Sequence, residues 1–379
     1  MRVALHMGTL RGHGSAAVGR GTLTAIATQA PDSPILAWVP REWRDRDPTF
    51  TVNLPTNVEI RLTESGVARK LVDENVMIRR ALSRWGAQVL FSLGDTSLPA
   101  CPVPHVLLVQ QAHLAYTPEE RGFPSPPVLA ARWRLMELYL RACLPTVTHM
   151  TVQTQDMKDR MAARYGYPGN DITVVPTPVE LQVPSDREGG GSDEPSVVYV
   201  SSAGHHKNHA VLVPMMAALR HRHPELVCRV TISREDLPTL TRAIEQRGLS
   251  SRFRFDGVVP HSRALRMMRD ARVVVIPSKL ESFGLPYYEA MGTGAAVVAA
   301  DRAFAREACA SAALYADADD GVGFADAVTR VLSSPALEER LRDEARRRFD
   351  AVRASWQTVG ETYWELLARA AHQRCTWTS

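Results

Sequence analysis

The chain has 379 residues, of which 45% are hydrophobic and 23% are charged, and its formal net charge is +4. These values are ordinary for a soluble globular protein, and the length predicts two or three domains that each bury a proper core. So small a net charge argues against nucleic acid as a partner. Almost every basic residue is Arg, and the only lysines are Lys70, Lys158, Lys207 and Lys279.

The cysteines are five in number, scattered and without a C-x-x-C pair. This usage favours reduced thiols in a cytosolic protein and argues against a zinc site. The N-terminus leads directly into a strand-like segment without a long apolar signal region. No apolar run approaches the roughly 20 residues that span a bilayer. We therefore expect a cytoplasmic protein.

The first strand, at residues 2–6, is followed by a loop that contains Gly8, Gly12 and Gly14 and then by a helix from about 15 to 28. A strand, a glycine-rich loop and a helix start can bind a phosphate. The loop lacks the G-x-G-x-x-G spacing with a later acidic residue, which argues against NAD. A merely tight turn is the alternative interpretation.

Strand-like segments then alternate with helical patterns, which predicts βαβ units and a parallel sheet. The predicted strands are 35–39, 58–62, 89–93, 106–110 and 150–153, and the main predicted helices are 67–85 and 128–144. Ligands of such sheets bind beyond the carboxyl ends of the strands. Two loops are candidates on that ground, residues 94–96 with Asp95 and residues 110–116 with His113.

The amphipathic segment Arg132–Arg141 mixes basic and aromatic residues. It could rest on an anionic membrane. The alternative is that its Leu, Met and Trp side chains pack on the sheet.

Residues 186–195 form the clearest linker, and a new strand begins at Val197. After this strand, Lys207 stands just before a helix predicted at 210–221, where its charge could reach a diphosphate. Strands are expected at 228–232 and 253–256, and helices at 237–248 and 262–271.

The most informative stretch is 273–301. A β-branched strand at 273–276 leads through a polar loop into a helix whose first turn contains Pro286. Free N–H groups near Phe283, Gly284 and Leu285 would attract phosphate. The nearby carboxylates of Glu281 and Glu289 repel phosphate but accept hydrogen bonds from hydroxyl groups. A phosphate flanked by two polyols indicates a nucleotide sugar.

The string Pro-Ser-x-x-Glu-Ser-Phe-Gly-Leu-Pro-x-x-Glu-Ala-Met, with Glu281 and Glu289 as its acids, resembles the E-x7-E signature of retaining GT-B glycosyltransferases of family 4 (glycosyl transferases group 1). The resemblance implies an α/β fold of two Rossmann-like domains that face a central cleft. It places an acceptor-side domain at 1–185, the linker at 186–195 and a nucleotide-sugar domain at 196–355. A C-terminal helix, 356–379, would pack back on the first domain.

The resemblance implies transfer of a sugar, with retention, from a UDP- or GDP-sugar to a hydroxyl acceptor, in polysaccharide, glycoconjugate or natural-product biosynthesis. It implies no metal and no other cofactor. The implied catalytic residues are Glu281, His113 and Lys207. The implied donor-binding residues are Ser201, Ser202, His206, Lys207, Asn208, Gly257, Val258, Glu281, Ser282, Phe283, Gly284, Leu285 and Glu289. The implied acceptor-side residues are Gly12, Gly14, Asp95 and His113.

The chain departs from the family at one important place. Relatives carry an Arg five or six positions before Lys207, where this chain has Ser201 and Ser202. Either His205, His206 or backbone amides substitute for it, or donor binding is weaker, or the site is degenerate. Two alternatives to a transferase therefore stay open: a non-catalytic nucleotide-sugar-binding relative and a GT-B-fold sugar-nucleotide epimerase.

Overall fold

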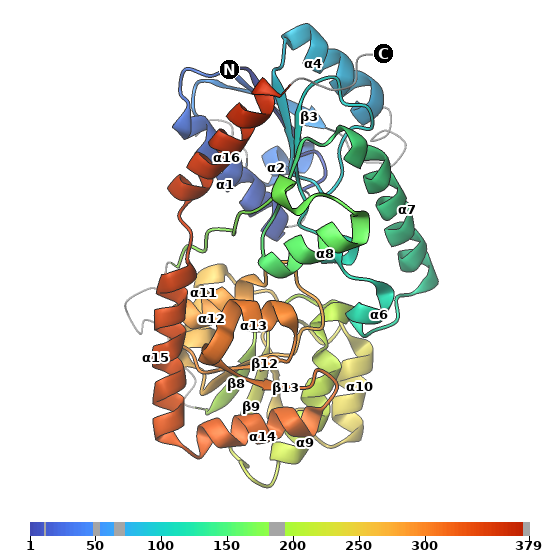
Figure 1. The fold of residues 1–379 in the computed structure, drawn as a ribbon. Helices are drawn as coiled ribbons and strands as arrows, with labels where there is room; N and C mark the ends of the chain where they lie inside the picture. Colours follow the sequence, from blue (N-terminus) through green and yellow to red (C-terminus); the bar gives the residue numbers. More distant parts are fainter. Residues whose placement is uncertain (11–12, 48–53, 64–72, 182–193, 374–379) are drawn as a thin grey trace. The chain divides into compact units, whose positions relative to one another are not determined.

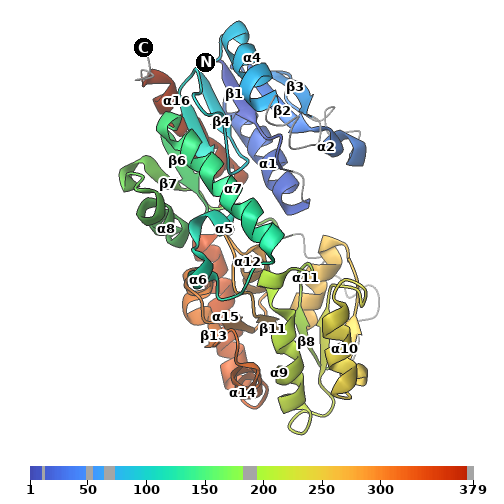
Figure 2. The ribbon, with the colours of Figure 1, turned by 90° about the vertical axis from the view of Figure 1, so that its right-hand side faces the viewer.

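The structure is a computed structural model that describes residues 1–10, 13–47, 54–63, 73–181 and 194–373. Contacts between Cα atoms divide the chain into two compact units. Unit 1 comprises residues 1–117, 125–178 and 354–379, and unit 2 comprises residues 118–124 and 179–353. Each unit is an α/β layer structure built on one parallel sheet (Figures 1 and 2).

The sheet of unit 1 has seven parallel strands in the order β3-β2-β1-β4-β5-β6-β7. They are β1 (Val3–His6), β2 (Ile35–Pro40), β3 (Val58–Thr63), β4 (Val89–Ser92), β5 (His105–Leu108), β6 (His149–Val152) and β7 (Ile172–Val174). The chain order reverses between β1 and β4, which is the topological switch point of a doubly wound sheet.

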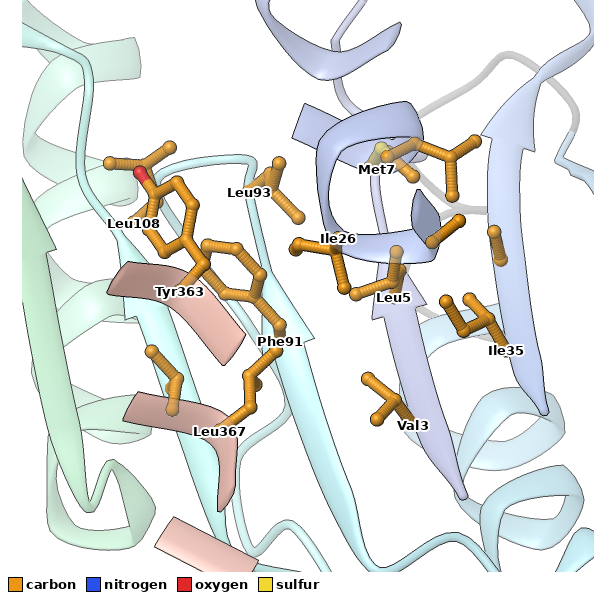
Figure 3. Close-up of a cluster of buried hydrophobic side chains, with 14 of the residues drawn as sticks. Val3, Leu5, Met7, Ile26, Ile35, Phe91, Leu93, Leu108, Tyr363 and Leu367 are labelled. Atoms are coloured by element: carbon orange, nitrogen blue, oxygen red, sulfur yellow. The ribbon is translucent and has the colours of Figure 1, made fainter. Parts of the chain in front are cut away.

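Helices cover both faces of this sheet. They are α1 (His13–Gln29), α2 (Arg41–Arg46), the π-helix η1 (Asp73–Ile78), α4 (Arg79–Trp85), α5 (Ala112–Ala115), α7 (Pro127–Cys143), α8 (Gln155–Tyr165) and α16 (Trp356–His372). Side chains alternate between the faces of β1, as period 2 requires. Val3 and Leu5 enter the core with Ile26 of α1 and Leu367 of α16 (Figure 3), whereas Ala4 packs in the cluster of α4.

The sheet of unit 2 has six parallel strands in the order β10-β9-β8-β11-β12-β13. They are β8 (Ser196–Tyr199), β9 (Val227–Val230), β10 (Phe253–Phe255), β11 (Val273–Ile276), β12 (Val297–Ala300) and β13 (Ala313–Ala316). The helices are α6 (Pro118–Arg121), α9 (Leu212–Leu219), α10 (Pro238–Gln246), α11 (His261–Asp270), α12 (Leu285–Gly292), α13 (Ala303–Cys309), α14 (Gly321–Leu332) and α15 (Pro335–Val352).

The alternation of strands and helices predicted from the sequence is confirmed, and most bounds agree within a few residues. The helix predicted at 67–85 is described only from Asp73, where it begins as a π-helix. Four short helices were not predicted, namely α2, α5, α6 and α13, because four to seven residues carry too little periodicity to stand out from a loop.

Residues 118–124 belong with unit 2, although they lie within the range expected for the first domain. Two buried or half-buried cations hold them there. Lys279 Nζ donates to Gly122 O at 3.1 Å, and Arg302 donates to Glu120 O and Arg121 O. The linker was expected at residues 186–195. Residues 186–193 of it lie outside the described residues.

Candidate functional site

The switch point of unit 2 lies between β8 and β11. These strands are parallel neighbours, with Val197 opposite Val273. The chain runs from β8 outward to β10 on one side and from β11 outward to β13 on the other. The loops that follow β8 and β11 therefore diverge above the carboxyl end of the sheet, where open α/β sheets bind ligands.

Lys207 and Glu281 form an ion pair between these two loops. The distance from Lys207 Nζ to Glu281 Oε1 is 2.6 Å, and the side chains are only 12% and 11% exposed. Burial by itself would lower the pKa of the Lys207 ammonium, but the negative charge of Glu281 outweighs that effect and the pKa is raised. Lys207 thus stays a cation at neutral pH.

Asn208 ties the β8 loop to two other loops. Its backbone is left-handed, with φ 57° and ψ 39°, a conformation that Asn tolerates better than most residues. Its Nδ2 donates to Pro277 O at 3.1 Å and to Ala318 O at 2.7 Å. The loops after β8, β11 and β13 are therefore held in one arrangement, and the position of Lys207 with them.

Two further hydrogen bonds fix the backbone at His206 and Lys207, and the sequence did not predict them. The hydroxyl of the buried Tyr199 donates to Lys207 O at 2.9 Å and lies 2.9 Å from Ser278 Oγ. The backbone N–H of Lys279 donates to His206 O at 2.8 Å. An aromatic residue in a strand gives no sequence signal for such a role, since most such residues only fill a core.

The N-terminus of α12 lies in the β11 loop. Gly284 has φ +77°, and a Cβ atom there would stand 2.6 Å from the ring of the fully buried Tyr287. In the described part of the chain, no acceptor is recorded for the N–H groups of Gly284 and Leu285. Phe283 stacks on Tyr288 with ring centroids 4.2 Å apart and is 4% exposed. The side chain of Phe283 is therefore unavailable to a ligand, and only its backbone groups can bind one.

Glu289 lies on the second turn of α12, with a side chain that is 14% exposed. His261, at the start of α11, lies with Nε2 2.8 Å from Glu289 Oε1, and this hydrogen bond raises the pKa of His261. The sequence analysis missed His261. Its proximity to Glu289 arises from the packing of α11 against α12, which no local pattern encodes.

Among the described residues, no cation is found at the two serines in place of the family Arg. Ser201 N donates to Thr231 Oγ1 at 3.0 Å, and Ser201 Oγ lies 3.0 Å from His209 Nε2. Ser202 is exposed. Burial, followed by the charge of Lys207, lowers the pKa of His206 to about 4. His206 is therefore neutral at pH 7 and can offer a hydrogen bond but no permanent charge.

The other expected donor contacts are less well placed. Ser282 lies in the β11 loop beside Glu281. Gly257 has φ +66° and Val258 is 96% exposed. They follow β10, which β9 separates from β8, so the strands stand roughly 10 Å apart.

In unit 1, Asp95 has a structural role, because its side chain joins two loops by hydrogen bonds. It has φ +67°, and its Oδ1 accepts from the N–H groups of Gln110 and Gln111 at 2.6 and 2.7 Å. It thereby connects the loop after β4 to the loop after β5. Both loops therefore lie at the edge formed by the carboxyl ends of the parallel strands.

His113 lies on the short helix α5 and is 8% exposed, so it is not a surface-loop residue. Its ring stacks on Trp133 of α7, with centroids 4.1 Å apart and an interplanar angle of 12°. His113 Nδ1 lies 3.2 Å from Gln111 Oε1. An amide oxygen only accepts, so this contact places the ring proton on Nδ1.

The glycine-rich loop after β1 is shorter than expected. Gly14 lies in the first turn of α1, and a Cβ atom there would meet nothing within 4 Å. The helix begins at His13 rather than near Ser15, so the prediction of Gly14 as a loop residue is wrong. Gly12 lies outside the described residues. Across the described ranges, no group of three or more His, Cys, Asp or Glu side chains could hold a metal ion.

Comparison with known families agrees with this geometry. Residues 184–348, which contain Lys207, Glu281 and Glu289, match the family model described as Glycosyl transferases group 1. This segment is a group 1 glycosyl transferase domain. The resemblance to glycosyl transferases group 1 seen in the sequence is thereby confirmed.

Curated relatives of the group 1 domain are glycosyltransferases. D-inositol 3-phosphate glycosyltransferase 1 of Catenulispora acidiphila is 24% identical over 262 residues, or 62% of this chain and 61% of the relative. MMP alpha-(1->4)-mannosyltransferase of Mycolicibacterium hassiacum is 27% identical over 64% of this chain and 60% of the relative. The chain thus matches about three fifths of the length of these relatives.

Solved structures resemble the whole chain. Sucrose-phosphate synthase from Thermosynechococcus elongatus has a TM-score of 0.73 at 17% identity, with 97% of this chain and 98% of that chain covered. Anabaena HepE in complex with UDP and glucose has a TM-score of 0.72 at 16% identity, with 97% and 100% covered. At these identities the likeness establishes the fold, which is GT-B, as the sequence predicted.

Proposed function

We propose that the chain is a retaining, metal-independent glycosyltransferase of family 4 that moves a sugar from a UDP- or GDP-sugar to a hydroxyl acceptor. The observation that carries this proposal is the Lys207–Glu281 pair at the switch point of unit 2, beside the N–H groups that open α12. A cation, free amides and two carboxylates at one place match the groups of a nucleotide sugar, with its diphosphate and two polyols.

The leaving diphosphate gains negative charge as the glycosidic bond breaks. Preorganised cations and N–H dipoles stabilise such a charge most effectively when they are fixed before the reaction. Lys207 and the N–H groups of Gly284 and Leu285 have this role in our proposal. The hydrogen bonds of Asn208 and Tyr199 hold Lys207 in place for it.

The two glutamates bind the polyols. Glu289 accepts from the ribose hydroxyls, with His261 as its second partner. Glu281 accepts from a hydroxyl of the transferred sugar. In the unliganded site Glu281 neutralises Lys207 instead, so donor binding exchanges one buried ion pair for two new contacts, cation to phosphate and carboxylate to sugar.

The acceptor side of the proposal rests on unit 1. His113, whose Nδ1 is directed at Gln111 Oε1, can form a hydrogen bond near the reacting sugar. The names of the relatives favour a polyol acceptor and a UDP-sugar donor: one is an inositol phosphate glycosyltransferase, and one neighbour was solved with UDP and glucose.

The serines at 201 and 202 favour a second candidate, a nucleotide-sugar-binding protein without turnover. Among the described residues, Lys207 is the only permanent cation that we assign to the diphosphate, because His206 is neutral. Turnover with any acceptor excludes this candidate. Incubation with the donor alone separates the transferase from an epimerase, which needs no acceptor.

Calorimetric titration with UDP and GDP tests the donor site. We expect Lys207→Ala and Glu289→Ala each to weaken binding at least roughly tenfold, as loss of one charged hydrogen-bond partner does. Lys158→Ala, a lysine of unit 1, is the matched control. Unchanged affinity in both site variants contradicts the donor assignment, and an inverted linkage in the NMR spectrum of the product contradicts the retaining mechanism.

A further inference from the structure

Residues 118–124, which we call the strap, leave unit 1 and return to it within a short span of sequence. The chain on either side, up to Thr117 and from Ser125, belongs to unit 1, whereas the strap packs in unit 2. It contains the short helix α6, and Arg121 at the end of this helix is 5% exposed. Ordering such an excursion costs backbone entropy, which contacts with unit 2 must offset.

The strap is held through its backbone carbonyl groups. Arg302 donates to Glu120 O and to Arg121 O. Lys279 Nζ donates to Gly122 O at 3.1 Å. These carbonyl groups lie at the C-terminal end of α6, where they lack partners inside the helix and attract cations. Docking of the strap therefore depends on two cations of unit 2, one on each side of β12.

Lys279 links the strap to the loop after β11. The residue is 8% exposed. Besides Gly122 O, its ammonium group contacts the carboxylate of Asp319, in the loop after β13. Its backbone N–H donates to His206 O, in the loop after β8, at 2.8 Å. Three segments thus meet at one residue, and the buried ammonium cannot leave its acceptors without becoming an unpaired charge.

The loops that Lys279 joins carry the two halves of the proposed diphosphate site. One half is Lys207, in the loop after β8. The other half is the pair of N–H groups of Gly284 and Leu285, in the same loop as Lys279. A diphosphate reaches both halves only when the two loops keep their spacing, and a displacement of about 1 Å is enough to weaken such contacts strongly.

We propose that Lys279 is a positioning residue of the donor site and that the strap holds it in place. Lys279 does not touch the nucleotide in this proposal; it fixes the loop after β11 against the loop after β8. The inference rests on the proposed function, because the diphosphate is the group that requires this spacing. The alternative is that the two cations only cap α6, so that they stabilise the strap and nothing else.

Calorimetry with UDP and hydrogen–deuterium exchange, both on the full chain, test the proposal. Lys279→Met keeps the apolar stem of the side chain and removes its charge. We expect this variant to exchange the amides of the strap faster and to bind UDP roughly tenfold more weakly. Lys279→Arg keeps the charge and the donors, so its UDP affinity should return to within about twofold of the wild-type value.

Arg302 separates the role of the strap from that of Lys279 alone, because it contacts the strap and lies outside the loop after β11. Arg302→Met should also speed up exchange in the strap, and it should weaken UDP binding roughly threefold or more. Arg306→Met, on the helix that Arg302 precedes, is the matched control. Arg306 pairs with Asp301 and contacts no strap residue within the described ranges, so this variant should behave like the wild type.

Faster exchange in Arg302→Met at an unchanged UDP affinity overturns the proposal, since the strap then docks without positioning the loop. Unchanged exchange of the strap in either variant overturns it as well. So does a Lys279→Arg variant that binds UDP as weakly as Lys279→Met. Failure of the proposed function has a separate signature, because the wild type itself then binds neither UDP nor GDP, and the inference falls with it.

Discussion

At the scale of single residues, the proposed donor site contains a cation that already forms an ion pair with a neighbouring carboxylate. Glu281 holds Lys207 at 2.6 Å and competes with any phosphate for it. Its charge also repels a diphosphate. In the proposed function Glu281 therefore opposes binding of the nucleotide and favours binding of the sugar, and the two effects can be separated by measuring UDP without a sugar.

We predict that Glu281→Gln strengthens UDP binding by roughly three- to tenfold, because Lys207 loses its competing partner and the site loses one negative charge. Transfer of sugar should fall at the same time, since the amide is a weaker acceptor for the sugar hydroxyl. Calorimetry with UDP measures the first effect. Glu225→Gln, an exposed acid of the same unit, controls for the change in net charge. Weaker UDP binding in Glu281→Gln would contradict the competition.

Gly284 and Gly257 have the same backbone conformation in different surroundings. Their φ angles are +77° and +66°, but a Cβ atom at Gly284 would stand 2.6 Å from the Tyr287 ring, whereas at Gly257 it meets nothing within 4 Å. We predict that Gly257→Ala lowers the free energy of unfolding by about 1–2 kcal/mol, the cost of a left-handed alanine. Gly284→Ala should lower it by at least a further 1 kcal/mol, since the buried ring must move.

Urea denaturation of both variants checks this difference. An equal loss in the two variants would show that the ring of Tyr287 can yield, and that Gly284 is required only for its backbone angle.

At the scale of elements, unit 1 depends on the contact between α1 and α16. Gly360 of α16 faces the backbone of α1, and a Cβ atom there would stand 2.8 Å from Ala25 O. A Cβ atom at Gly21 of α1 would likewise clash with the ring of Trp356. The two glycines allow the helices to approach closely, and the core that includes Tyr363 and Leu367 forms beside this contact (Figure 3).

We predict that Gly360→Ala lowers the free energy of unfolding by about 1–3 kcal/mol, because a backbone oxygen cannot move aside as a side chain can. The sign is diagnostic, since Gly to Ala inside a helix otherwise stabilises it by about 1 kcal/mol. Thermal unfolding provides the measurement. Glu361→Ala, at the adjacent exposed position, should change stability by less than about 0.5 kcal/mol. A stabilised Gly360→Ala variant would mean that the helices can separate without cost.

The elements that the sequence predicted best are those with strong local patterns. β11 is a continuous β-branched run and α12 has a proline near its start, so both were predicted from the sequence. The Lys207–Glu281 pair, by contrast, joins residues 74 positions apart in the chain and was assigned as two separate ligands. His261 and Tyr199 were missed for the same reason. A contact across loops depends on the register of β8 against β11, which neither loop encodes.

At the scale of the whole molecule, both units bury ionisable side chains that the proposed chemistry does not use. His105, on β5, is fully buried, and its two ring nitrogens have no hydrogen-bond partner among the described residues. Burial, followed by the charge of His6, lowers the pKa of His105 to about 3. In unit 2, burial followed by the charge of Lys207 lowers the pKa of His209 to about 4.

These pKa values predict a loss of stability in acid. Above pH 6.5 His105 is neutral in both states, and its titration has no effect. As the pH falls from 6.5 toward 3, the unfolded chain binds a proton that the folded chain does not, so the free energy of unfolding decreases. At pH 5 the loss from His105 alone is about 2 kcal/mol, at roughly 1.4 kcal/mol for each pH unit below 6.5.

We therefore predict that His105→Leu makes stability less dependent on pH. Between pH 7.5 and pH 5 the wild type should lose about 2 kcal/mol more than the variant in urea denaturation. The comparison is made within each protein, so the change in packing that leucine introduces cancels. His372→Leu, at the C-terminal end of α16, is the control and should retain the wild-type pH dependence, since its side chain is exposed. Equal slopes in the wild type and His105→Leu would mean that His105 reaches a hydrogen-bond acceptor when protonated.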